Sequence, residues 1–147
     1  MRKNILVVDD DPELVELLRY NLSAVGYSVA TASDGADALR KARSFKPDLI
    51  LLDLMMPKLD GFAVCEILRR DTETSEIPII ILTAMSSQLA RVAGLGAGAA
   101  DFICKPFSPK ILLERVRGIL YAADCTETTQ SCTAPVMPVL RRSFSPS

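Results

Sequence analysis

Five polar residues stand at the ends of segments with strand character, where they could form one chemical site. In chain order they are Asp9, Asp10, Asp53, Thr83 and Lys105. One aspartate in such a place is usually a helix cap or a solvated loop residue, but three gathered carboxylates repel one another unless a cation neutralises them. Oxygen ligands suit Mg²⁺, while a lysine and a hydroxyl suit an anion such as a phosphoryl group. The residue types therefore indicate a combined metal and anion site.

Alternating strand-like and helix-like segments position these residues. Apolar runs predict strands at residues 5–8, 27–32, 49–52, 79–82 and 100–104. Helical periodicity predicts helices at residues 12–25, 38–45, 62–68, 87–95 and 109–120. This alternation is typical of an α/β fold, a doubly wound five-stranded parallel sheet in the flavodoxin-like order 2-1-3-4-5 with helices on both faces. Ligands of such sheets bind beyond the carboxyl ends of the strands, where the polar residues stand.

Local signals mark where the first elements begin and end. Asp11 is expected to cap the first helix with Pro12 at its first position, and Gly26 to end it. The pair Asp34-Gly35 is interpreted as the turn that closes the second strand.

The composition changes near residue 124, which divides the chain into two parts. Residues 1–123 are predicted to form one domain. Residues 124–147 contain eight Ser or Thr residues and three prolines, and they are predicted to be a disordered tail or the remnant of a linker. The alternative for residues 136–142, which include a short apolar cluster, is docking to a partner.

Composition excludes several classes of function. The chain has no histidine, so it holds neither a Ser-His-Asp triad nor an imidazole metal site. A net charge of −1 argues against a broadly basic nucleic-acid surface. The four cysteines fall in no CxxC pair, which disfavours a zinc site or a disulfide framework. Neither a signal peptide nor an apolar stretch long enough to span a membrane is evident, so we expect a soluble, cytoplasmic protein.

Motifs spread along residues 4–121 resemble one known family, the receiver (response regulatory) domain of bacterial two-component response regulators. They are the stretches 7–12, 51–57 and 98–107, together with the pairs Asp60-Gly61 and Thr83-Ala84. None of these motifs would suffice alone, whereas their joint occurrence in the right order is highly specific.

The resemblance implies a role for each acidic residue of the site. Asp53 would accept a phosphoryl group from a phosphohistidine on a sensor histidine kinase or a histidine phosphotransfer protein. Asp9, Asp10 and Asp53, with the backbone carbonyl of Met55, would hold Mg²⁺. The protein would then be a phospho-acceptor switch that assists its own phosphorylation and dephosphorylation, and not an enzyme acting on other substrates.

The resemblance also implies how the switch responds. Lys105 would pair with the phosphoryl oxygens, Thr83 would donate a hydrogen bond to them, and Phe102 would turn inward as Thr83 moves. The Lys105-Pro106 peptide bond would be cis. The signal would leave through the face formed by the helix at 87–95, the strand at 100–104 and the helix at 109–120.

That face commonly dimerises in related transcriptional regulators through ion pairs between subunits. Arg91, Asp101 and Arg115 stand where the pattern has charges, but Ile111 replaces an expected acid, so the homodimer is an incomplete match. No DNA-binding output domain is expected in this chain, and hence no direct binding of nucleic acid. Met55 and Met85 occupy the positions that tune acyl phosphate hydrolysis, and neither could orient a water, which predicts a long-lived phosphorylated state.

Four other interpretations fit less well. A haloacid-dehalogenase-like phosphatase needs an aspartate two residues after Asp53, where this chain has Met55. A flavodoxin-type cofactor binder needs a phosphate loop where residues 9–12 are acidic. The G-x-G-x-x-A string at 94–99 follows a helix and precedes a strand, the reverse of the dinucleotide-binding context. A receiver that is never phosphorylated would not need the complete set of acids with Thr83 and Lys105.

Overall fold

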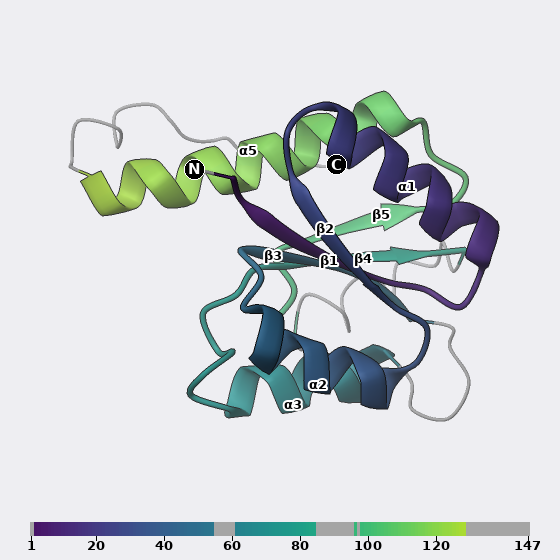
Figure 1. The fold of residues 1–147 in the computed structure, drawn as a ribbon. Coiled ribbons are helices and arrows are strands. Elements are labelled where there is room, and N and C mark those ends of the chain that lie inside the picture. Colours follow the sequence, from purple (N-terminus) through teal and green to yellow (C-terminus); the bar gives the residue numbers. More distant parts are fainter. Residues whose placement is uncertain (1, 55–60, 85–95, 97, 129–147) are drawn as a thin grey trace. The chain divides into compact units, whose positions relative to one another are not determined.

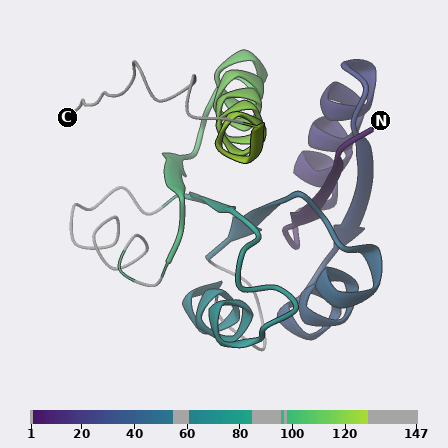
Figure 2. The ribbon, with the colours of Figure 1, turned by 90° about the vertical axis from the view of Figure 1, so that its left-hand side faces the viewer.

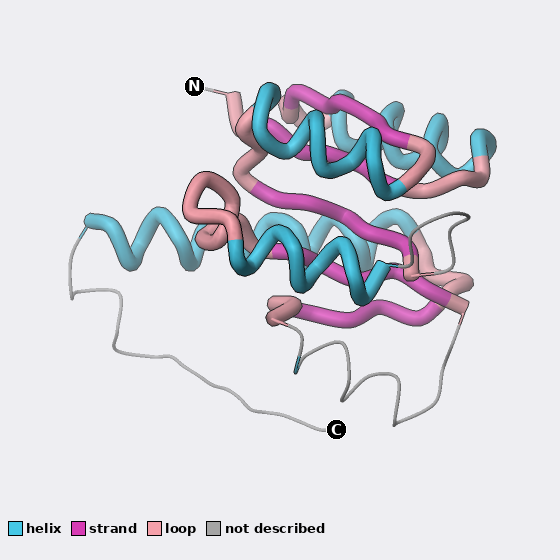
Figure 3. The backbone as a smooth tube through the Cα atoms, turned by 90° about the horizontal axis from the view of Figure 1, so that it is seen from below, coloured by secondary structure: helices cyan, strands magenta, loops and turns pink. Residues whose placement is uncertain are grey.

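The computed structural model describes residues 2–54, 61–84, 96 and 98–128, and its strands form one parallel sheet (Figure 1). The strands are β1 (Asn4–Val8), β2 (Ser28–Ala32), β3 (Leu49–Asp53), β4 (Ile79–Thr83) and β5 (Asp101–Cys104). Their order is β2-β1-β3-β4-β5, and every neighbouring pair is parallel. The predicted fold class and strand order are confirmed. Figure 3 shows the strands side by side, so their carboxyl ends share one edge of the sheet.

The described helices are α1 (Pro12–Ala24), α2 (Gly35–Phe45), α3 (Gly61–Arg70) and α5 (Pro109–Thr128). Helix α1 lies on one face of the sheet, and α2 and α3 lie on the other (Figures 1 and 2). The helix expected at 87–95 lies outside the described residues. The chain divides into two compact units, residues 1–114 and 115–147, and the sheet and the predicted site belong to the first.

Two of the three inner strands, β3 and β4, are buried along their whole length, as their unbroken apolar runs require. Below them, the side chains of Ile50 and Ile81 pack in one cluster with Ala42, Val64 and Leu68 from α2 and α3. Removing an isoleucine or leucine from water stabilises the fold by about 1.5–3 kcal/mol. The rigid central strands therefore hold the residues at their carboxyl ends in fixed positions.

Aspartate caps set the starts of α1 and α2. As predicted, Asp11 caps α1, and its Oδ1 accepts a hydrogen bond from the Glu13 N–H at 3.1 Å. Asp34 differs from the prediction, because it caps α2 by accepting from the Asp37 N–H at 2.8 Å. Helix α2 thus begins at Gly35 and not near residue 38, since an aspartate before glycine serves a helix start as well as a turn.

Other boundaries also differ from the sequence prediction, and those of β2 and α5 are instructive. Strand β2 begins at Ser28, because the Tyr27 N–H donates to the Leu22 carbonyl at 3.1 Å and so belongs to the end of α1, where Gly26 has a φ of 103°. Helix α5 continues to Thr128, beyond the end predicted at residue 120, and alanines near that point favour helix. None of the described helices is long and apolar enough to cross a membrane.

The two cysteines with described side chains are expected to differ in reactivity. Cys65 is buried in α3, and this burial raises the pKa of its thiol, while Cys104 at the end of β5 is exposed. Thiolates are the reactive form, so an alkylating reagent should modify Cys104 first and Cys65 only when the protein opens. Peptide mapping by mass spectrometry during a time course measures both rates. Equal rates at the two thiols in the native protein would contradict the structure.

Candidate functional site

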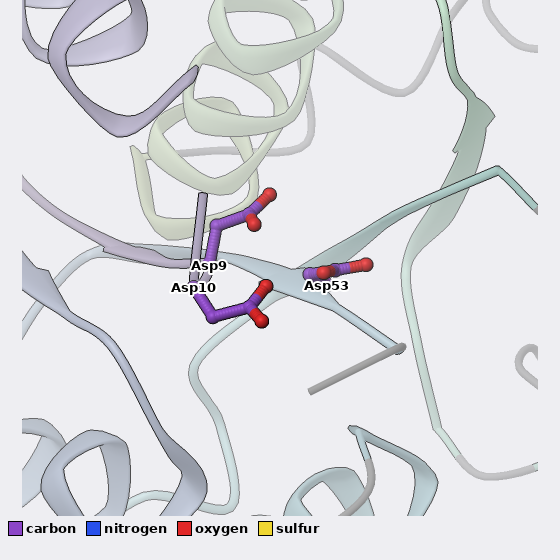
Figure 4. A group of neighbouring side chains, drawn as sticks. All are labelled: Asp9, Asp10 and Asp53. Atoms are coloured by element: carbon purple, nitrogen blue, oxygen red, sulfur yellow. The ribbon is translucent and has the colours of Figure 1, made fainter. Parts of the chain in front are cut away.

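The carboxyl ends of β1 and β3 bring three carboxylates together (Figure 4). Val8 pairs with Leu52 in the sheet, so the residues that follow them, Asp9 and Asp53, emerge side by side. One carboxylate oxygen from each of Asp9, Asp10 and Asp53 lies within 4.8 Å of the other two. Asp9 and Asp53 are buried, with 2% and 3% of their surface exposed, whereas Asp10 faces solvent.

Backbone contacts fix the direction of Asp9. Its N–H donates to the Ala32 carbonyl at 3.1 Å, which continues the pairing of β1 with β2. Its Oδ1 accepts from the Asp11 N–H at 3.0 Å, at the start of α1. The other oxygen, Oδ2, is therefore held toward the interior of the site.

Lys105 supplies the positive charge beside these acids. Its Nζ lies 2.9 Å from Asp9 Oδ2 and 3.7 Å from Asp53 Oδ1. Its backbone N–H donates to the Thr83 carbonyl at 2.7 Å, which ties it to β4, and the peptide bond to Pro106 is cis. The sequence indicates a lysine suited to an anion, and in this structure its ammonium group lies beside two carboxylates.

The hydroxyl and the aromatic residue of the predicted switch lie on the neighbouring strands. Thr83 is the last residue of β4 and is fully buried, one position beyond Leu82, which pairs with Asp53. Phe102 on β5 is 3% exposed and belongs to the core cluster. Met55 and Met85 lie outside the described residues.

Gly61, the first residue of α3, lies against the end of β3. Its N–H donates to the Leu54 carbonyl at 3.2 Å. A Cβ atom at this position would lie 2.7 Å from the backbone oxygen of Asp53 and 2.7 Å from Cα of Leu54, too close for any side chain. The sequence marks Gly61 only as part of the Asp60-Gly61 motif. The signal that could have revealed its structural role is its position directly after an aspartate, at the start of a helix.

The donor set fits Mg²⁺. Three carboxylates with one lysine leave the site with a net charge of about −2 when all four groups are ionised. Their oxygens are the hard donors that Mg²⁺ prefers, and the exposed Asp10 leaves the site open to water ligands.

Comparisons with known proteins agree with this geometry. The model of the response regulator receiver domain family matches residues 5–117. The alkaline phosphatase synthesis transcriptional regulatory protein PhoP of Bacillus subtilis is 52% identical over 124 residues, which are 84% of this chain and 51% of PhoP. The DNA-binding response regulator MtrA of Mycolicibacterium smegmatis is 48% identical over 120 residues, 82% of this chain and 51% of MtrA. The chain thus spans about half the length of these relatives.

Solved structures give the same result. The chemotaxis response regulator CheY4 of Vibrio cholerae superimposes with a TM-score of 0.77 at 32% identity, over 81% of this chain and 99% of CheY4. The BeF3-activated receiver domain of Klebsiella pneumoniae RstA gives a TM-score of 0.75 at 36% identity, over 80% of this chain and 97% of that domain. By family model, sequence identity and fold, the chain belongs to the response regulator receiver domain family.

Proposed function

We propose that Asp53 accepts a phosphoryl group from a phosphohistidine on a sensor histidine kinase or a histidine phosphotransfer protein, in the cytoplasm. The observation that carries this proposal is the arrangement of charged side chains at the carboxyl ends of β1 and β3. A buried carboxylate lies within 4.8 Å of two others and 3.7 Å from an ammonium group. Membership of the receiver family, whose members are phospho-acceptor switches, supports the same assignment.

In the transfer, an oxygen of the Asp53 carboxylate forms a bond to phosphorus as the bond from phosphorus to the partner's imidazole nitrogen breaks. The bonding electron pair stays with that nitrogen, and Asp53 becomes an acyl phosphate. No general base is needed, because a carboxylate is already deprotonated at neutral pH. Lys105 lies close enough to exchange its contact with Asp9 for one with the phosphoryl oxygens, and Thr83 can donate its hydroxyl hydrogen to them.

Asp9, Asp10 and Asp53, with the backbone carbonyl of Met55, would hold Mg²⁺. When bound, the ion neutralises charge on the transferring phosphoryl group. The buried Asp9 and Asp53 are held by the sheet, so their oxygens need little rearrangement.

The added phosphoryl charge would draw Thr83 and Lys105 toward Asp53. Phe102 is buried on β5, which pairs with β4. A movement of Thr83 at the end of β4 would therefore change the packing of Phe102 and with it the outer surface of β5. We propose that this surface carries the signal, and that phosphorylation favours a homodimer there. The contribution of Arg91 lies outside the described residues.

Mg²⁺ should stabilise the protein through Asp10. At ten times its dissociation constant, the ion should add about 1.4 kcal/mol to the free energy of unfolding. Asp10→Asn removes an exposed carboxylate from the cluster, so without Mg²⁺ the variant should be more stable than the wild type. Mg²⁺ should then add much less to the free energy of unfolding of the variant than to that of the wild type. Urea titrations with and without Mg²⁺ measure this. Glu13→Gln, an exposed acid outside the cluster, is the matched control; equal Mg²⁺ gains in Asp10→Asn and the control would contradict the assignment.

The proposed function is tested with a small phosphodonor and Mg²⁺. The protein should gain the mass of one phosphate in an acid-stable, base-labile linkage, and peptide mapping should place it on Asp53. No gain, or a gain on another residue, would overturn the proposal. After removal of the donor, the same assay follows the decay, and loss of the phosphate within seconds would contradict the long life inferred from Met55 and Met85.

A further inference from the structure

The backbone groups on the outer edge of β2 pair with no other strand among the described residues. Strand β2 ends the sheet and pairs with β1 alone among the described strands. The Ser28 N–H donates to the Lys3 carbonyl at 2.9 Å, and the Ala32 carbonyl accepts from the Asp9 N–H at 3.1 Å. Backbone groups of successive residues point to opposite sides of a strand. The N–H and C=O groups of Val29 and Thr31 therefore point away from β1.

One of these groups is covered by a lysine of the neighbouring helix. Nζ of Lys41 on α2 donates a hydrogen bond to the Thr31 carbonyl oxygen, and lies 3.3 Å from Asp37 Oδ2 on its own helix. The side chain is 36% exposed, so the ammonium group sits at the surface, at the sheet edge. The contact occupies an acceptor and places a positive charge where another strand would have to approach.

We propose that Lys41 prevents the free edge of β2 from pairing with the same edge of a second copy of this chain. In an antiparallel pair related by a two-fold axis, Val29 of each copy would face Thr31 of the other, and the two pairs would exchange four hydrogen bonds. The Thr31 carbonyl is the acceptor in two of them. With Lys41 bound to it in both copies, those two bonds are blocked and two ammonium groups repel each other.

A second copy is the fitting partner because the edge is complementary to itself. Two-fold pairing needs only the alternation of donors and acceptors that β2 already has on its outer side. Val29 and Thr31 are both β-branched, which favours an extended pair. A lysine at the edge is one of the means by which sheet proteins avoid such association.

Lys41→Met tests the proposal, because methionine keeps the aliphatic chain and lacks the donor. Arg40→Met is the matched control: Arg40 forms an ion pair with the same Asp37, and none of its described contacts reaches β2. Sedimentation over a range of concentrations should show self-association roughly thirtyfold tighter in Lys41→Met than in the wild type, the effect of two recovered hydrogen bonds. The control should match the wild type. Unchanged self-association in Lys41→Met would overturn the proposal.

Two further variants identify the surface that associates. Ala30 lies on the two-fold axis of the proposed pair, where Cα atoms approach to about 4.5 Å, so Ala30→Cys should form a disulfide between two copies when combined with Lys41→Met. Val29→Pro removes an outward N–H without touching the β1 ladder and should reverse the association. Association that survives Val29→Pro, or that gives no disulfide between the two introduced thiols, would assign it to another surface and refute the proposal.

Discussion

Asp53→Asn is expected to abolish phosphorylation of this chain while making the protein more stable in the absence of Mg²⁺. The amide has the shape of the carboxylate but lacks its nucleophilic oxygen, so no acyl phosphate forms. The substitution also removes one of three carboxylates whose oxygens lie within 4.8 Å of one another. The lost repulsion outweighs the lost attraction to Lys105 at 3.7 Å, because Lys105 keeps its closer contact with Asp9 at 2.9 Å. The expected gain is roughly 1 kcal/mol.

Intact-mass measurements with a phosphodonor and urea unfolding without Mg²⁺ check the two halves of this prediction. Asp48→Asn is the matched control, since Asp48 directly precedes β3 and Asp53 ends it. Asp48 Oδ2 accepts a hydrogen bond from the Asn4 N–H at 2.8 Å, so this control should lose stability and retain phosphorylation. A phosphate gain that persists in Asp53→Asn would disprove the site, and a fall in its stability would disprove the repulsion among the acids.

Gly61→Ala is expected to destabilise the protein and to slow phosphorylation of Asp53. The new methyl group would lie 2.7 Å from the Asp53 backbone oxygen and 2.7 Å from the Leu54 Cα atom, and both neighbours are backbone atoms of a buried segment. The end of β3 must move, and overpacking of this kind costs about 1–3 kcal/mol. Because the crowded backbone oxygen belongs to Asp53, the proposed phosphoacceptor, the Asp53 carboxylate moves with it.

Gly118→Ala in α5 is the control for Gly61→Ala. No atom lies within 4 Å of a Cβ at this exposed position, so the same substitution should stabilise the helix by about 0.5–1 kcal/mol and leave the phosphorylation rate unchanged. Urea unfolding and the initial rate of the mass gain measure both variants. A Gly61→Ala protein as stable and as rapidly phosphorylated as Gly118→Ala would show that the close approach has no consequence.

Sequence patterns predicted most of the fold because they reflect burial. The apolar run before Asp53 is buried on both faces, and such a strand has little alternative to the middle of a parallel sheet. The acidic cluster followed from the same pattern, since parallel strands end at a common edge. The roles of individual residues came from the family resemblance, and the structure confirms the predicted strand order.

What the sequence could not supply were contacts between side chains and distant backbone. Nothing near Lys41 in the chain indicates that its ammonium group reaches the Thr31 carbonyl, ten residues away. The close approach of Gly61 to the Asp53 oxygen is a contact between residues eight positions apart, which no local pattern reveals. The cap at Asp34 was missed for another reason, because an Asp-Gly pair suits both a turn and a helix start, and only the geometry decides between them.

The ion pair between Lys105 and Asp9 joins residues 96 positions apart in the chain. During synthesis the acids of β1 and β3 leave the ribosome long before the lysine that balances them. A nascent chain that ends before Lys105 therefore leaves Asp9 and Asp53 without the neighbouring ammonium group and without β5 beside β4. The site should therefore be complete only after Lys105 has been synthesised and β5 has paired with β4.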